Sequence, residues 1–283
     1  MPRHSMPDAN LQWRRLPQGL LAFDEARGVP VAGIGHHFFR PWLFPLYTPS
    51  GQQVLQEFAF DHPFHNGCFM GWSPVRVEGV DHNFWATPPQ RSQPDPMMER
   101  LGRQRLEGEV RTAREGADLV ATMEVAWDAH DGTPLLAEER VFSLRAGAVA
   151  HAVRVQSRLR AVAGDVELPV TKFAGLGVRL DARLTQSTGA VFCGDAGRGD
   201  AAFLHGKPSS FVAIEGGHGT HRFGLRLSSQ QALPWFVRGY GLVLLNPVTE
   251  APRRLRAGEV LAQDITLVAY DGEGRNQALD TLG

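Results

Sequence analysis

The sequence predicts an all-β protein, built as one large antiparallel β-sandwich with few short helices. Three observations predict this fold class. Apolar and polar residues alternate with a period of two in several segments, glycine (31) and proline (19) recur at short intervals, and no segment has a helical repeat of three or more turns. Many short, half-buried strands joined by tight turns have this pattern.

The alternation is clearest in residues 119–127, 153–160 and 222–227. In the second of these segments, valine and leucine occupy one side of the expected strand, and Arg154 and Arg158 lie on the other side. Because successive side chains of a strand point to opposite faces, we expect one face of each strand to be buried and the Arg-rich face to be solvated.

The remaining elements are connections. Residues 86–98 are rich in proline and are expected to form an irregular loop, with a short helical turn near residues 96–100. Nothing marks a linker or an internal repeat. We therefore expect a single β-sandwich domain over residues 1–283, with residues 1–10 as a flexible tail.

Composition excludes several classes of function. The formal net charge of −1 and the pI near 6.8 give no electrostatic footprint for nucleic acid and no polybasic membrane patch. No window approaches the roughly 18 apolar residues of a membrane span, and the N-terminus lacks an apolar signal core. We expect a soluble, cytoplasmic protein in which Cys68 and Cys193 are two buried free thiols rather than a disulfide.

The most informative segment is residues 61–67, with the sequence Asp-His-Pro-Phe-His-Asn-Gly. Pro63 prevents a helix, so His62 and His65 converge only if the chain turns between them. Prolines, aromatics and histidines also crowd the neighbouring residues 40–51 and 79–85, which is typical of a small-molecule pocket. The alternative interpretation is a pair of ordinary surface histidines.

A second candidate is the adjacent pair Glu138 and Glu139, on a strand that follows the hairpin signal at residues 131–132. One of the two must face inward, where burial would raise its pKa toward that of a general base. The alternative is a charged strand end paired with an arginine.

Further candidates are residues that suit sugar binding. Lys172 and Arg179 border a glycine-rich turn and would hold an anionic or polyhydroxylated ligand. Trp235, Arg238 and Tyr240 combine flat rings with a planar cation, as carbohydrate sites do, although core aromatics with a structural arginine would give the same pattern. The sequence has no serine-hydrolase elbow, zincin motif or paired Cys-x-x-Cys. A divalent metal held by His62, His65 and a carboxylate is left open.

Six blocks of the sequence carry a resemblance that runs from about Arg40 to about Ala269: residues 40–51, 61–65, 79–81 with 84–85, 138–140, 171–179, and 238–241 with 246–247. Taken together they resemble an uncharacterised bacterial family labelled PmoA-like or methane oxygenase-like. A membrane monooxygenase needs spanning helices, which this sequence lacks, so the label does not fit the chain.

The chain also departs from that family's pattern. The usual stretch is Asp-His-Pro-His-His-Arg, whereas this sequence has Phe64 and Asn66, and Trp72 replaces a histidine that is common shortly afterwards. These departures favour a two-histidine acid/base site over a metal-binding one.

The resemblance implies a galactose-mutarotase-like supersandwich that acts on carbohydrates. We therefore predict a mutarotase or epimerase acting on a sugar or oxidised sugar, with no cofactor. The alternatives are a metal-dependent lyase or hydrolase of keto-glycosides and a non-catalytic sugar-binding module. The oligomeric state is left open. The predicted catalytic residues are His62, His65 and Glu139, and the predicted substrate-binding residues are Arg40, Trp85, Lys172, Arg179, Trp235, Arg238, Tyr240 and Asn246.

Overall fold

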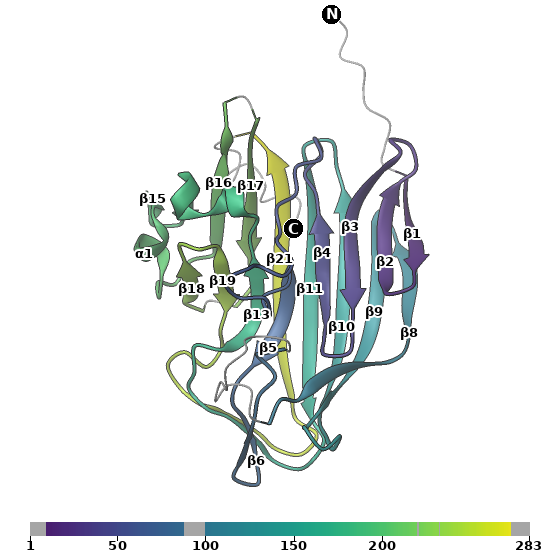
Figure 1. Ribbon diagram of the computed structural model, residues 1–283, viewed down its shortest axis with the longest axis vertical. Helices are drawn as coiled ribbons and strands as arrows, with labels where there is room; N and C mark the ends of the chain where they lie inside the picture. Colours follow the sequence, from purple (N-terminus) through teal and green to yellow (C-terminus); the bar gives the residue numbers. More distant parts are fainter. Residues whose placement is uncertain (1–9, 88–99, 220, 232, 273–283) are drawn as a thin grey trace, which may run out of the picture.

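The computed structural model describes residues 10–87, 100–219, 221–231 and 233–272, and its named strands all pair antiparallel (Figure 1). The predicted all-β antiparallel sandwich is confirmed. The three segments with the clearest alternation lie in strands β9 (Asp118–Asp128), β11 (Ala150–Ala161) and β17 (His221–Ser228). The expected helical turn at residues 96–99, most of the loop at 86–98 and the N-terminal tail at 1–9 lie outside the described residues.

One layer of the sandwich is an eight-stranded sheet in the order β1-β2-β3-β4-β5-β13-β19-β18. The N-terminal strands form a meander along one half of this sheet, and later parts of the chain complete the other half. The bounds are β1 (Leu11–Leu16), β2 (Gly19–Asp24), β3 (Val29–His36), β4 (Pro41–Leu46), β5 (Cys68–Trp72), β13 (Ala174–Arg179), β19 (Leu242–Leu245) and β18 (Trp235–Arg238).

The second layer is a nine-stranded sheet in the order β15-β14-β16-β17-β21-β11-β10-β9-β8. Its long central strands follow the regions of strict alternation, because each buries one face against the first layer. The bounds not yet given are β15 (Gly197–Gly199), β14 (Val191–Gly194), β16 (Phe211–His218), β21 (Val260–Asp271), β10 (Pro134–Ala146) and β8 (Arg103–Glu115).

A small four-stranded sheet lies at the lower end of the molecule in Figure 1 and consists of β20 (Arg253–Leu255), β12 (Val166–Leu168), β6 (Val75–Val77) and β7 (Val80–His82). The described helices are short: η2 (Ala182–Leu184), η3 (Gln186–Thr188) and α1 (Ala201–Leu204). None of the helices in the described ranges has the length and apolar character needed to cross a membrane.

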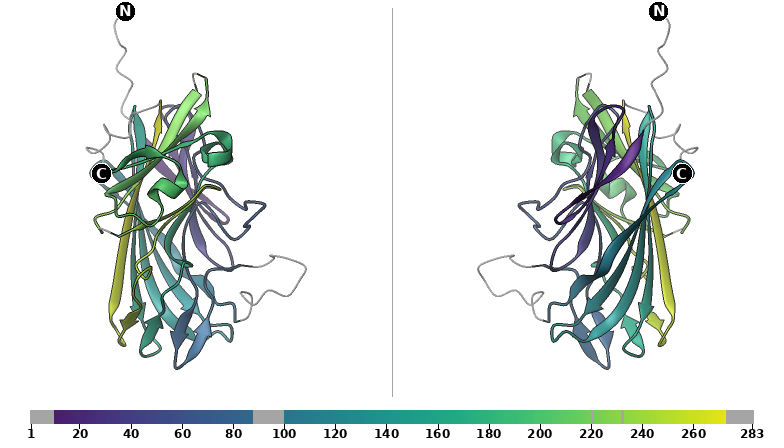
Figure 2. Two further views of the ribbon diagram at one scale, coloured as in Figure 1. Left: turned by 90° about the vertical axis from the view of Figure 1, so that its left-hand side faces the viewer. Right: turned by 90° about the vertical axis from the view of Figure 1, so that its right-hand side faces the viewer.

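The two large sheets form two layers that are seen edge-on in Figure 2.

Side chains of the eight-stranded sheet point alternately to the core and to the outer face, as strand β5 illustrates. Cys68, Met70 and Trp72 join the main core between the layers, whereas Phe69 points to the outer face. There it belongs to a separate apolar group, called the outer cluster here, which consists of Trp42, Phe69, Trp85, Leu242 and Leu244.

Both cysteines are buried thiols that form no disulfide, as predicted from the sequence. Burial raises the pKa of the Cys68 thiol to about 12, even though Arg140 acts in the opposite direction. A thiol reacts as its thiolate, so a buried, protonated thiol is inert.

We expect neither cysteine to react with a maleimide in the folded protein and both to react after unfolding in guanidinium. Stoichiometric labelling of the native protein, detected by mass spectrometry, would contradict this expectation.

Candidate functional site

The two histidines of the 61–67 motif lie in the connection between β4 and β5. They lie on the outer side of the eight-stranded sheet, because His65 stacks on Phe69 of the outer cluster. The backbone N–H of His62 donates to the carbonyl of Ala59 (3.0 Å), and that of His65 donates to the carbonyl of His62 (2.9 Å). These successive turns supply the bend that Pro63 permits and an extended strand would not. They place both imidazoles on the same side of the chain.

The two imidazoles belong to a stack of four rings. The centroids of Tyr240 and His62 are 5.0 Å apart, those of His62 and His65 are 4.9 Å apart, and those of His65 and Phe69 are 5.6 Å apart. The rings are nearly parallel, with interplanar angles of 9°, 5° and 16°. The stack runs inward from a partly exposed end, since Tyr240 is 36% exposed and His65 and Phe69 only 2% and 1%.

Asp61 holds His62 from the side. One carboxylate oxygen lies 2.9 Å from Nδ1 of His62, and the other accepts a hydrogen bond of 2.7 Å from Nη2 of Arg179. Partial burial acts to raise the pKa of Asp61, but the hydrogen bond with His62 and the charge of Arg179 outweigh it and lower that pKa. An ionised carboxylate accepts only, so Nδ1 of His62 carries the proton and Nε2 presents a lone pair.

His65 is a different kind of group. Burial is the main cause that lowers its pKa to about 2, and the positive charges of Arg179 and Arg40 act in the same direction. The ring is therefore neutral at physiological pH and offers one N–H donor and one lone pair. Neither ring nitrogen has a hydrogen-bond partner within the described part of the chain.

Arg40 lies behind His65, with its guanidinium carbon 5.2 Å from the centroid of Phe69. Its Nη2 donates to the carbonyls of Phe84 (3.2 Å) and Trp85 (2.5 Å), and its Nε and Nη1 have no partner among the described residues. Burial, together with the charge of Arg140, lowers the pKa of Arg40 to about 9, so the group is still a cation at neutral pH.

The floor of the site is the outer cluster. The ring of Trp85 lies edge-on to His65 (5.4 Å between centroids) and contacts Phe69 (5.5 Å). Glycines on the outer face make room for these rings: a Cβ at Gly177 would lie 3.0 Å from Phe69, and a Cβ at Gly71 would lie 3.0 Å from Trp85. The glycines therefore let the aromatic rings lie directly on the sheet.

Main-chain hydrogen bonds fix both ends of the loop that carries the histidines. The N–H of Gln56 donates to the carbonyl of Arg179 (3.0 Å), that of Gly67 donates to Gln56 (2.8 Å), and that of Arg179 donates to Gly67 (2.8 Å). These bonds hold Arg179, at the end of β13, beside the His62 turn.

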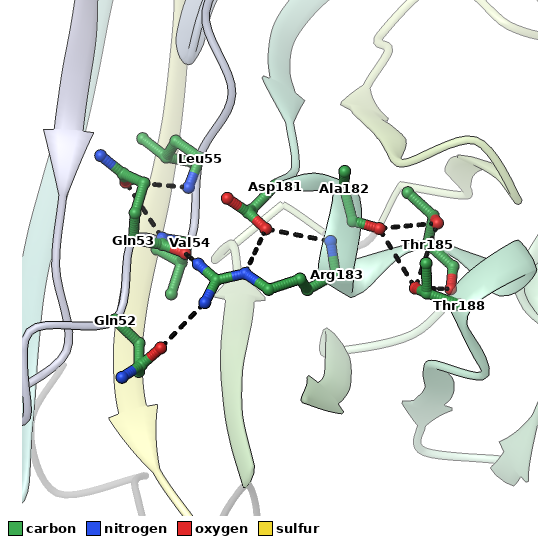
Figure 3. Close-up of polar contacts among 9 residues, drawn as sticks. All are labelled: Gln52, Gln53, Val54, Leu55, Asp181, Ala182, Arg183, Thr185 and Thr188. Carbon is green, nitrogen blue, oxygen red and sulfur yellow. Dashed lines mark hydrogen bonds and ion pairs between the residues drawn. The ribbon is translucent and has the colours of Figure 1, made fainter. Parts of the chain in front are cut away.

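Arg183 provides a second anchor, which Figure 3 shows. Its Nη1 donates to the side chain of Gln52 (2.9 Å), its Nη2 donates to the carbonyl of Gln53 (3.1 Å), and its Nε donates to Asp181 (2.8 Å). The start of the loop is thereby tied to η2, immediately after β13.

The structure does not bring the predicted base, Glu139, to the histidines. Glu139 lies on the outer face of the nine-stranded sheet, where it lines a hollow of about 310 Å³ with Gln156 and Arg158. Glu138 points into the sandwich instead. It is fully enclosed and accepts hydrogen bonds from Arg140 (2.8 and 2.7 Å), Trp127 (2.8 Å) and Ser157 (2.7 Å). Both of its carboxylate oxygens are therefore occupied by hydrogen bonds within the core.

Two of the predicted substrate-binding residues are also structural. Trp235 faces the main core, and its Nε1 donates to the carbonyl of Ser209 (2.8 Å). Asn246 is buried, donates to the carbonyl of Thr171 (2.6 Å) and accepts from the N–H of Val248 (2.9 Å). Neither side chain is directed toward the stacked rings.

The remaining predicted residues lie around the site. Arg179 is buried and joins Asp61, while its guanidinium carbon is 5.0 Å from the ring centroid of Tyr240. Lys172 is exposed and lies over Phe173, whose ring contacts Trp85 (5.7 Å). Arg238 packs on Phe236 of the outer face and acts on Tyr240 by its charge. The role of Asp61 was missed in the sequence, although its position directly before His62 was a signal.

A metal ion does not suit the two histidines as they lie. Each imidazole binds a metal in its own ring plane, and the planes of His62 and His65 are stacked and nearly parallel, so they do not meet at one ion. Asp61 occupies Nδ1 of His62, which leaves only Nε2 of that ring available to a ligand. Within residues 10–87, 100–219, 221–231 and 233–272, no group of three or more His, Cys, Asp or Glu side chains is placed to hold a metal.

Fold and site together define an antiparallel β-sandwich protein with a His-Asp-Arg cluster on the outer face of one sheet. The chain belongs to a family of unknown function, DUF6807, whose model matches residues 34–282. The resemblance to an uncharacterised family is thus confirmed. The description of the matching family does not include the methane oxygenase-like label. A search of curated proteins finds no significant match.

Solved structures similar to this chain include a putative aldose 1-epimerase from Escherichia coli K12, with 10% identity over 92% of this chain and 99% of that chain and a TM-score of 0.37. A galactose mutarotase-like protein from Lactobacillus casei has 7% identity over 92% of this chain and 100% of that chain, with a TM-score of 0.39. At TM-scores below 0.5, these likenesses carry no argument about the activity.

Proposed function

We propose that the protein is a carbohydrate-active enzyme of the mutarotase or epimerase type, which moves protons on a sugar by acid/base chemistry. The observation that carries this proposal is the Asp61–His62 pair at the partly exposed end of the ring stack. A carboxylate that fixes the tautomer of a histidine leaves the opposite ring nitrogen free to act as a base near neutral pH.

In this proposal, Nε2 of His62 removes the proton from the anomeric hydroxyl of the sugar. Burial raises the pKa of Tyr240, so its hydroxyl keeps its proton and can donate a hydrogen bond to the ring oxygen. The sugar ring opens as Tyr240 passes its proton to the ring oxygen, rotates about its first carbon–carbon bond and closes on the other face. On closure the ring oxygen returns its proton to Tyr240, and His62 returns its proton to the anomeric oxygen. Asp61 and His62 take the role that the sequence had assigned to Glu139, which lies on another face of the molecule.

The other groups have supporting roles in the proposal. Arg179 keeps Asp61 ionised and so keeps His62 oriented. The neutral His65 provides one donor and one acceptor behind His62. Trp85 and Phe69 exclude water from that side. The sequence is the basis for proposing a sugar as the ligand. It is also the basis for proposing a cytoplasmic location.

Proton NMR of the protein with a panel of aldoses, uronates and keto-glycosides tests the proposal. We expect exchange of magnetisation between the two anomers of at least one aldose or uronate, faster than in buffer alone. An enone or a released aglycone would support the lyase or hydrolase alternative instead. Line broadening without any exchange or product would support the sugar-binding module and contradict the enzyme proposal.

A further inference from the structure

Arg40 is a buried cation without an anionic partner in the described part of the chain. Arg140 is buried to the same extent as Arg40, because both residues are 1% exposed, and the charge of Arg140 acts on Arg40. Arg140 is neutralised by Glu138 through two hydrogen bonds. Arg40 makes hydrogen bonds only to backbone carbonyls, which supply no charge.

His65 is a buried polar side chain at the same end of the ring stack as Arg40. The guanidinium carbon of Arg40 lies 5.2 Å from the centroid of Phe69, and the ring of Phe69 stacks on that of His65 at 5.6 Å. Neither ring nitrogen of the neutral His65 has a partner within the described residues. Arg179 lies at the other end of the stack, against Tyr240, and its Nη2 is bound to Asp61.

The charges of the buried side chains around the ring stack do not balance. Arg40 and Arg179 contribute two positive charges, Asp61 contributes one negative charge and His65 is neutral, which leaves an excess of one positive charge. Water can satisfy the hydrogen bonds of a buried guanidinium, but it does not neutralise the charge. Burying an uncompensated ion is costly, whereas an anion placed beside it removes that cost.

We propose that the ligand of this site carries a carboxylate or a similar anionic group, which binds to Arg40 beside His65. The proposal rests on the proposed function, because it names the class of sugar, a sugar acid such as a uronate, that the Asp61–His62 pair would act on. Nε and Nη1 of Arg40 each lack a partner among the described residues, and a hydrogen bond from a guanidinium to a carboxylate is stronger than one between neutral groups. The approach passes the partly exposed His62, Asp61 and Tyr240.

Matched pairs of sugars that differ only in the carboxylate test this inference. Binding of glucuronate and glucose, and of galacturonate and galactose, is measured by saturation-transfer NMR and calorimetry on the full-length protein. We expect each uronate to bind about ten-fold or more tightly than its neutral parent, because the ion pair forms out of water. Equal affinities within both pairs, or binding of neither member, would overturn the inference.

Variants of Arg40 locate the effect. In R40Q, which removes the charge, the preference for the uronate should disappear, whereas R40K should keep much of it. The matched control is R76Q, which removes an exposed arginine that pairs with Asp81 and Glu167 on the small sheet. An equal loss in R76Q would reveal an effect of net charge alone and overturn the inference. Should R40Q fail to fold in a thermal unfolding assay, the wild-type sugar pairs and R40K still decide the matter.

Anomer exchange separates this inference from the proposed function. Uronates that bind tightly while their anomers exchange at the rate in buffer would leave the inference intact and contradict the enzyme. Catalysed exchange of a neutral sugar, with no preference for its uronate, would support the enzyme and overturn the inference.

Discussion

Replacing His62 by asparagine is expected to slow the catalysed exchange of sugar anomers by about 10²- to 10⁴-fold, the range for loss of a general base. The asparagine amide can still donate to Asp61 in place of Nδ1, so Arg179 and the loop should stay in position. The variant lacks the lone pair of Nε2 and the ring that stacks between Tyr240 and His65. The rate should therefore fall far more than the affinity for the sugar.

Exchange rates and dissociation constants for wild type and H62N, measured side by side by NMR, check this expectation. The matched control is H130N, because His130 is exposed in the turn between β9 and β10, away from the ring stack. That variant should retain the wild-type rate. A His62 variant with unchanged turnover would refute the role of His62 as the base and, with it, the proposed mechanism.

The second large effect concerns stability. Replacing Arg140 by alanine is expected to destabilise the folded protein by about 3–5 kcal/mol, because it leaves Glu138 as an unpaired buried charge. Glu138 is enclosed between the sheets and accepts two hydrogen bonds from Arg140. Urea unfolding of wild type and R140A measures the difference. E139Q is the control, and since Glu139 is on the outer surface its stability should lie within about 0.5 kcal/mol of wild type.

The stability difference between R140A and wild type should depend on pH in a definite direction. Burial acts to raise the pKa of Glu138, but the charge and hydrogen bonds of Arg140 outweigh burial and lower it. In wild type, the contribution of the pair is complete above the pKa of an unfolded glutamate and is lost as pH falls through the lower folded value. In R140A, only the hydrogen bonds of Ser157 and Trp127 still oppose burial, so the deficit should be largest at neutral pH and shrink on acidification. A deficit that stays constant down to acidic pH would contradict the explanation.

The fold class was predictable because strand periodicity is a local signal. The alternation within residues 119–127 and 153–160 reappears in β9 and β11, where the odd-numbered positions are buried and several even-numbered positions are only partly buried or, in β11, exposed. The pairing of strands far apart in sequence was not predictable from that signal. The pairing of β13 with β5 joins residues more than a hundred positions apart, such as Gly177 and Phe69, and this pairing brings Arg179 to the His62 turn.

The candidate site was predictable only in part, for the same reason. The Asp-His-Pro-x-His motif is local, and its turn, its two imidazoles and Asp61 come from consecutive residues. Alternation assigns Glu138 and Glu139 to opposite faces, but it does not say which face of the sandwich carries a site. The inward Glu138 turned out to balance Arg140. Alternation likewise does not say which of Trp235 and Phe236 faces the outer cluster; in the structure Trp235 joins the main core and Phe236 packs against the outer cluster.

The bonds that hold the histidine loop have an evolutionary consequence. The contacts from Gln56 to Arg179, from Gly67 to Gln56 and from Arg179 to Gly67 join main-chain atoms, so they persist when the side chains of residues 57–65 are exchanged. The sheet beneath supplies the aromatic floor and the guanidinium of Arg179 regardless of what the loop carries. Descendants of one ancestral gene can therefore acquire new reactions by altering about ten consecutive codons, without having to rebuild the architecture that supports them.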